Sequence, residues 1–135
     1  MYTEITSIEE AFKRHPDQID LNKTIEALSF LPKTISSGML SIMQLQVVCY
    51  TINNDDPNVE IFEPDYNNTN QYKWGQWCLG GDSSGSGFRF RAVVWTDAHS
   101  SARGGARLAL RDQERARHMK KHFPDLYKNL YLILQ

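Results

Sequence analysis

A regular alternation of apolar and polar positions is clearest between residues 88 and 111. Over residues 88–95 apolar side chains occupy every second position, and the positions between them hold Arg89, Arg91, Val93 and Trp95. Leu108 and Leu110 continue this alternation after a turn rich in glycine and serine. A period of two is typical of a strand with one buried face, and the short link favours an antiparallel hairpin. We therefore predict a small antiparallel β-sheet over about residues 74–111.

Residues 33–53 are also rich in apolar side chains, but they do not alternate. Ile42 and Met43 are adjacent, as are Val47 and Val48. Residues 47–52 have strand propensity, yet a helical wheel gathers most apolar positions on one broad face. We predict a long central helix over about residues 33–53, with polar interruptions that argue against a membrane span. Its expected inward face holds Ile35, Met39, Ile42, Met43, Cys49 and Tyr50.

Helical spacing returns at both ends of the chain. Ser7 and Glu10 form a capping-box pattern, which predicts a short helix over about residues 8–14. Asp112 is a suitable N-cap for a C-terminal helix over about residues 112–133, in which Pro124 should cause a kink or a restart. With the sheet, these helices predict an α+β fold in a single domain, residues 1–135. The apolar stripe of the last helix comprises Ala116, Met119, Phe123, Leu126, Leu130 and Ile133.

Composition indicates a globular protein of ordinary size. The chain has 135 residues, of which 41% are hydrophobic and 23% charged, and its net charge is -1. Cys49 and Cys78 lie among apolar neighbours, so we expect buried free thiols. The first residues lack the basic and apolar regions of a signal peptide. We expect a cytoplasmic protein that does not enter a membrane.

The charges are divided unevenly along the chain. Residues 1–65 hold eleven acids and four bases, whereas residues 66–135 hold five acids and eleven bases. Two explanations remain open: the two halves face each other and pair, which we favour, or the basic half forms a surface for nucleic acid.

Aromatic and basic residues of the second half are candidates for binding. Aromatic rings beside arginines on an open sheet face can stack bases and hold phosphates. The simpler interpretation, which we favour, is that the tryptophans fill the core and cover the sheet edge. The candidate binding residues are Tyr72, Trp74, Trp77, Arg89, Arg91, Trp95, Arg115 and Arg117.

Catalytic patterns are weak. Gly81-Asp-Ser-Ser-Gly85 is similar to the segment around a serine protease nucleophile, but the chain is too short for that fold. His118 and His122 have the spacing of metal ligands on a helix, yet their neighbours are basic. Glu60 and Glu63 are paired acids beside a proline, and such pairs are more often exposed loop carboxylates than cation ligands. We therefore expect no metal, no cofactor and no enzymatic activity.

Four motifs occur in the order found in a family of small uncharacterised proteins. They are the stretch 64–74 with Trp77, Gly85-Ser-Gly-Phe88, Gly105-Ala-Arg-Leu-Ala-Leu110 and Asp125-Leu-Tyr-Lys128. Over residues 7–130 the chain resembles this family, which is widespread in bacteria of the Bacteroides group and in their phages and mobile elements. Tyr66 stands where the family has tryptophan. The resemblance implies a phage or mobile-element origin and supports a central helix, but it carries no activity.

The function expected from these observations is that of a non-catalytic binding or accessory protein that contacts another protein. The alternative is a nucleic-acid-binding modulator that uses a basic sheet and helix face, and an enzyme ranks third. The apolar end of the chain adds a further expectation. Tyr131 and Leu132 would face away from the core of a C-terminal helix, so we expect a weak homodimer through them.

Overall fold

The computed structural model describes residues 1–65, 67–68, 70–79, 89–96 and 108–133, and these are mostly helical. The predicted α+β class is therefore wrong. The chain begins with a short 3-10 helix, η1 (Tyr2–Glu4), and three α-helices, α1 (Ile8–Arg14), α2 (Leu21–Ala27) and α3 (Lys33–Asn53). Two strands, β1 (Lys73–Leu79) and β2 (Arg89–Thr96), precede α4 (Gln113–His122) and α5 (Pro124–Ile133).

The sheet predicted over residues 74–111 does not extend over that range in the part of the chain that the structure describes. Within the described residues, extended structure amounts to a two-stranded hairpin, in which β1 pairs antiparallel with β2, and an isolated bridge between Trp74 and Leu110. The predicted strand at residues 106–111 is not a strand where it is described, and residues 101–107 lie outside the described part. Leu108, Ala109 and Leu110 are all buried. This segment lies between α3, which contacts its carbonyl groups, and β1, so burial does not alternate along it.

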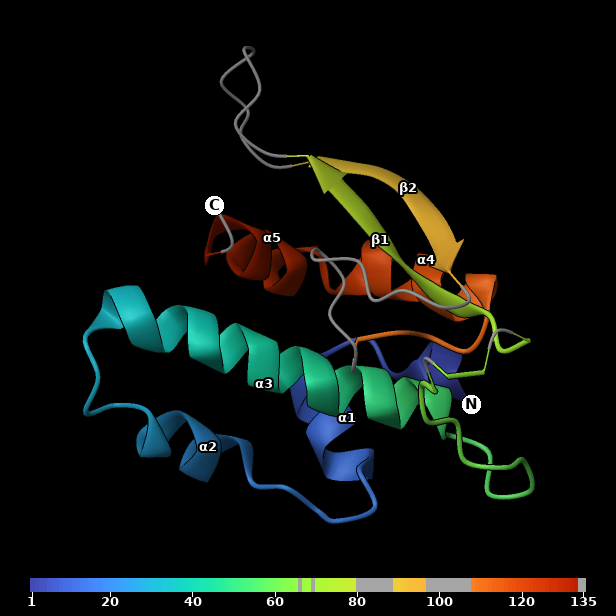
Figure 1. The fold of residues 1–135 in the computed structure, drawn as a ribbon. Coiled ribbons are helices and arrows are strands. Elements are labelled where there is room, and N and C mark those ends of the chain that lie inside the picture. The colour runs from blue at the N-terminus through green and yellow to red at the C-terminus, as the bar shows by residue number, and fades with distance from the viewer. Residues whose placement is uncertain (66, 69, 80–88, 97–107, 134–135) are drawn as a thin grey trace.

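Helix α3 organises the molecule. It has the bounds expected for the central helix, and it contacts α1, α4 and α5 (Figure 1). In the view of Figure 1, α1 and α2 lie below α3, whereas α4 and α5 lie above it. The hairpin β1–β2 packs on α4 rather than on α3. The central helix therefore packs between other helices, and not on a sheet as predicted.

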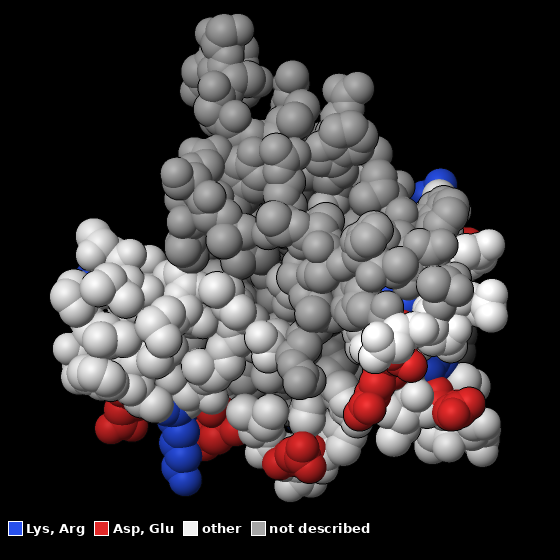
Figure 2. All heavy atoms as spheres, in the orientation of Figure 1, with Lys and Arg blue, Asp and Glu red and all other residues white. Residues whose placement is uncertain are grey.

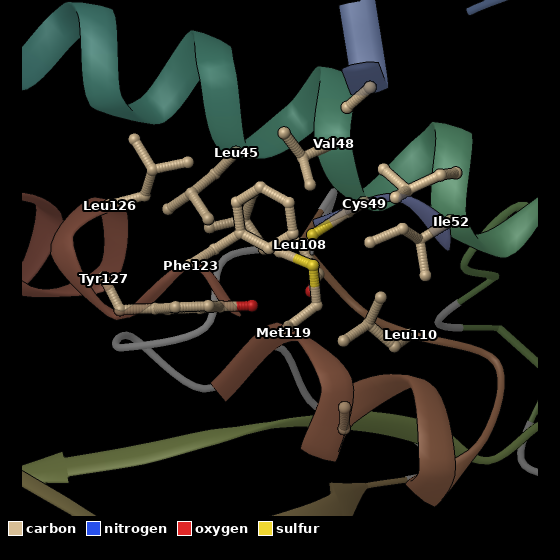
Figure 3. Close-up of a cluster of buried hydrophobic side chains, with 13 residues drawn as sticks. Leu45, Val48, Cys49, Ile52, Leu108, Leu110, Met119, Phe123, Leu126 and Tyr127 are labelled. Atoms are coloured by element: carbon tan, nitrogen blue, oxygen red, sulfur yellow. Dashed lines mark hydrogen bonds between the residues drawn. The ribbon is translucent and has the colours of Figure 1, made fainter. Parts of the chain in front are cut away.

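The hydrophobic core forms around the C-terminal half of α3 (Figure 3). Side chains from α3 meet those of α4 and α5, and the segment 108–110 fills the space between them. The labelled side chains are Leu45, Val48, Cys49, Ile52, Leu108, Leu110, Met119, Phe123, Leu126 and Tyr127. Cys49 is a buried free thiol, as predicted, and burial raises its pKa to about 12. The side chain of Cys78 lies outside those described.

The inward face of α3 differs from the predicted one. Ile35 and Met39 are 51% and 47% exposed, whereas Gly38, Ser41 and Gln44 are buried. Phe30, shortly before α3, is 80% exposed as well. Since α3 packs against α1 and α5, the positions of those helices, rather than the most apolar face of α3, decide which side chains are covered.

The length and composition of α3 would also allow it to cross a membrane, with a mean hydropathy of 1.3 over its most apolar window. The sequence argument against a span relied on polar interruptions, and these do not lower the mean hydropathy enough. Half of that window is buried inside the molecule, as in the core helix of a globular domain.

The C-terminal helix predicted over residues 112–133 restarts at Pro124, which is one of the two outcomes expected there, and so forms two helices. Helix α4 ends at His122 and α5 begins at Pro124, whose missing N–H suits a first helical position. The predicted N-caps are confirmed: the Arg115 amide donates to Asp112 Oδ1 at 2.7 Å, and the Glu10 amide donates to Ser7 Oγ at 3.2 Å. The side chains of Tyr131 and Leu132 lie outside those described, so the dimer expected through them stays a prediction.

Candidate functional site

A broad depression lies where the loop after α3 meets the first residues of β1 and α4. Its volume is about 1650 Å³. We call it the acidic groove. Its described lining residues are Val59, Glu60, Ile61, Phe62, Glu63, Pro64, Asp65, Asn67, Asn68, Gln71, Tyr72, Trp74, Arg111, Asp112, Gln113 and Glu114.

Short polar side chains shape the loop that forms one wall of the groove. Asp56 Oδ1 accepts the Asn58 amide at 2.9 Å, and Asp65 Oδ1 accepts the Asn67 amide at 2.9 Å. Such Asx turns bend the chain without secondary structure. The aspartates of this loop therefore shape the described part of the wall through hydrogen bonds to nearby backbone amides.

Longer side chains tie this wall together. Gln71 accepts the Asp65 amide at 2.7 Å and donates to Glu63 O at 2.9 Å. The buried Lys73 donates from Nζ to the carbonyl oxygens of Asn68 and Gln71, at 3.2 and 2.8 Å. These bonds fix the backbone of the wall through the protein's own side chains, and a wall fixed in this way reduces the entropy cost of binding.

Arg111 connects the loop to the body of the protein. Its Nη2 donates to Glu60 O at 2.5 Å, and its guanidinium lies 5.6 Å from the centre of the Phe62 ring. Its backbone N–H donates to Asn53 Oδ1, which fixes it to the end of α3. Arg111 was not predicted as a site residue, because nothing in the sequence places it beside residues 60–62.

The groove carries an excess of negative charge. No described residue forms an ion pair with Glu60, Glu63, Asp65 or Glu114, whereas Asp112 is paired with Arg115. Among the described lining residues, Arg111 is the one base. Figure 2 shows carboxylates on the lower right of the molecule, the side on which Figure 1 places the end of α3 and the loop after it. A positively charged ligand would therefore be attracted to this side.

Apolar side chains are exposed in the same groove. Val59, Ile61 and Tyr72 are 48%, 59% and 56% exposed. Trp74 is partly buried, packs against the hydrophobic core, and lines the groove. The groove thus combines unpaired carboxylates with exposed aliphatic and aromatic surface.

The predicted binding residues are not one cluster. Tyr72 and Trp74 lie together in the acidic groove, but Arg115 and Arg117 do not line it. The side chains of the other four, Trp77, Arg89, Arg91 and Trp95, lie outside those that the structure describes. Loop residues that were not predicted as binding residues line the groove beside Tyr72 and Trp74. Among these loop residues, Glu60 and Glu63 stand out in the sequence as paired acids.

Arg115 has an internal role. It donates from Nη2 to Asp55 at 2.9 Å and from Nε to Ile52 O at 2.8 Å, and it stacks 4.3 Å from the Tyr2 ring centre. It also pairs with Asp112. Burial raises the pKa of the Asp55 carboxyl, but the hydrogen bond and charge of Arg115 and the Tyr2 N–H outweigh it, so that pKa lies below its usual range.

A second, smaller cavity of about 640 Å³ adjoins the groove, and we call it the His15 pocket. Phe62, Glu63 and Pro64 line both cavities, so this short segment forms the wall between them. The His15 and Tyr50 rings lie 5.0 Å apart, centre to centre. The described lining residues are His15, Gln46, Val47, Tyr50, Asn53, Phe62, Glu63, Pro64 and Ala109.

A search of the described residues finds no group of three or more side chains suited to hold a metal ion. The predicted pair, His118 and His122, has ring centres 4.5 Å apart. His118 Nε2 lies 2.6 Å from Ile5 O, and its ring meets Tyr2 edge to face. These contacts attach α4 to the first residues of the chain.

No family model, curated protein or solved structure matches this chain. The resemblance to the small Bacteroides-group family therefore stays a prediction.

Proposed function

We propose that this protein is a non-catalytic binding protein, and that its acidic groove holds a basic, partly apolar segment of a partner protein. The observation that carries the proposal is the overlap of two kinds of surface in one concave site. Among the described residues, Glu60, Glu63 and Glu114 of the groove have no ion-pair partner, and Ile61 and Tyr72 are exposed there. Carboxylates attract and orient a basic segment, and apolar contacts supply most of the affinity.

The organisation of the loop supports the same proposal. Lys73, Gln71 and Arg111 hold the wall through backbone carbonyl groups. The acidic side chains therefore stay free for a ligand while the backbone beneath them is fixed. Such a surface binds without first having to fold.

The nucleic-acid alternative has less support. It requires a contiguous basic face, and Arg115 is one of its expected members. That guanidinium is already engaged by Asp55 and Asp112, so it is not available to a phosphate. The Asp55–Arg115 pair instead favours the interpretation in which the acidic and basic halves of the chain neutralise each other.

The test uses two fluorescein-labelled peptides, one of alternating lysine and leucine and one of alternating glutamate and leucine. Fluorescence anisotropy should detect binding of the basic peptide and no binding of the acidic peptide. Replacing two groove carboxylates, Glu60→Gln with Glu114→Gln, should weaken binding roughly tenfold at low salt, since about 1.4 kcal/mol corresponds to a tenfold change. The matched control, Glu9→Gln with Glu26→Gln, removes the same charge from exposed positions outside the groove.

Three results would contradict the proposal. The first is equal affinity for both peptides, and the second is an equal loss of affinity in the groove variant and its control. The third is tighter binding of a labelled thymidine oligonucleotide than of the basic peptide, with a steep salt dependence, which would favour the nucleic-acid alternative.

A further inference from the structure

The His15 pocket has buried and aromatic residues in its lining. Of its lining residues, Val47, Asn53 and Ala109 are buried. The His15 and Tyr50 rings stand side by side on its lining, inclined by 38°, and Phe62 contributes a third ring. A volume of about 640 Å³ is within the range of small-ligand pockets, roughly 300–1,000 Å³. The pocket can therefore enclose a flat group or a long side chain.

The polar groups of the pocket restrict what it can bind. Both functional groups of the Asn53 side chain are used, because Nδ2 donates to Ala109 O and Oδ1 accepts the Arg111 amide. His15 Nδ1 accepts the Asp17 amide at 3.1 Å, so the proton of the neutral ring is on Nε2. Burial lowers the pKa of His15, and the nearby Asp17 opposes this only in part, which favours the neutral ring near pH 7.

Glu63 is then the charged group of the lining. The described lining residues include no lysine or arginine. Aromatic faces attract cations, and a carboxylate at the rim strengthens that attraction. The pocket thus has the chemistry of a site for an organic cation.

We propose that the His15 pocket binds the guanidinium group of an arginine side chain carried by the segment that occupies the acidic groove. This inference rests on the proposed function. The two cavities share the wall Phe62–Pro64, so a segment in the groove passes beside the pocket. A guanidinium is planar and weakly hydrated, and it stacks on aromatic faces better than an ammonium does.

The protein already uses this contact twice. Arg111 lies 5.6 Å from the centre of the Phe62 ring, and Arg115 lies 4.3 Å from that of Tyr2. A guanidinium beside an aromatic ring is therefore a contact that this protein already makes, and one of the two rings, Phe62, also lines the pocket.

The experiment compares three labelled peptides built on the lysine–leucine sequence. In one, a central lysine is replaced by arginine, and in another by citrulline, which has the same shape without the charge. We expect the arginine peptide to bind about three- to tenfold more tightly than the lysine peptide, and the citrulline peptide to lose this gain. Tyr50→Leu should abolish the preference for arginine, and it should leave the affinity of the lysine peptide unchanged because Tyr50 does not line the groove.

The outcomes separate the two proposals. If the lysine peptide binds but arginine gives no gain, or if the gain survives Tyr50→Leu, the pocket proposal is wrong and the groove proposal stands. If no basic peptide binds, the proposed function fails. Titration with Nα-acetyl-arginine amide, followed by NMR of His15 and Tyr50, then decides whether the pocket binds guanidinium by itself. Should Tyr50→Leu fail to fold by circular dichroism, His15→Leu replaces it, because His15 lines the pocket and not the groove, and the arginine preference is again expected to fall.

Discussion

The two halves of α3 both carry large apolar side chains, and their surroundings differ sharply. In the C-terminal half, residues 44–53, Leu45, Val48 and Ile52 are fully buried. In the N-terminal half, residues 33–43, Ile35 and Met39 are about half exposed. The difference shows that burial along one helix is decided by what packs against it, since apolar side chains occur throughout.

The C-terminal half of α3 also contains buried polar side chains that form hydrogen bonds to other segments. Thr51 is buried, and its hydroxyl donates to Ala11 O at 3.2 Å and lies 2.8 Å from Val47 O. It therefore connects α3 to α1. Asn53, also buried, connects α3 to the segment 108–111. The C-terminal half is therefore held by specific hydrogen bonds as well as by apolar contact.

The largest expected effect comes from truncating the buried half. Leu45→Ala should lower the free energy of unfolding by about 2–5 kcal/mol, because it removes buried methyl groups and leaves a cavity. The matched change in the exposed half, Ile35→Ala, should cost roughly 0.5 kcal/mol or less. Urea denaturation followed by circular dichroism measures both. Equal costs would show that the two halves are buried alike.

A smaller loss is expected at the end of the buried half. Asn53→Ala leaves the Ala109 carbonyl and the Arg111 amide without their partner, which should cost about 1–3 kcal/mol. Asn58→Ala is the control, because Asn58 is exposed and only its backbone amide is bonded. If the two variants unfold at the same urea concentration, Asn53 does not hold the 108–111 segment in place.

The third prediction concerns the ion pair that follows this end of α3. The pKa of Asp55 is lower in the folded state than in the unfolded state, where it is about 4. The stability that the Asp55 charge provides is therefore present above the unfolded pKa, and it is lost as the pH falls through the folded pKa. Asp55→Asn should therefore cost about 1 kcal/mol at pH 7 and progressively less below pH 4. Thermal melts from pH 7 to pH 2 test this. A difference that stays constant over that range would mean that the Asp55 charge does not contribute.

Local signals in the sequence predicted much of the helical structure. The Ser7 and Asp112 caps lie where their spacing placed them, and α3 has the expected bounds. These features depend on neighbouring residues, so the sequence contains the information for them. Pro124 acts locally too, and it begins a new helix.

Features that depend on distant segments were not predictable. Leu108 and Leu110 alternate like a strand, but they lie between α3 and β1, which the sequence does not reveal. The groove joins residues 59–74 to residues 111–114, and Arg111 makes that connection. In the sequence, Tyr72, Trp74 and the acidic residues are separate candidates for binding. Their meeting in one site is a result of tertiary packing.

The smallest expected effect tests the exposed half of α3 directly. Ile35→Gln with Met39→Gln replaces two exposed apolar side chains by a residue with good helix propensity, so the free energy of unfolding should change by about 0.5 kcal/mol or less. The control pair, Leu45→Gln with Val48→Gln, places two amides in the core and should prevent stable folding. A large loss of stability in the variant Ile35→Gln with Met39→Gln would contradict the difference between the two halves of α3. A loss that depends on protein concentration would mean that another copy of the chain covers this half of α3, because association stabilises the folded state by mass action.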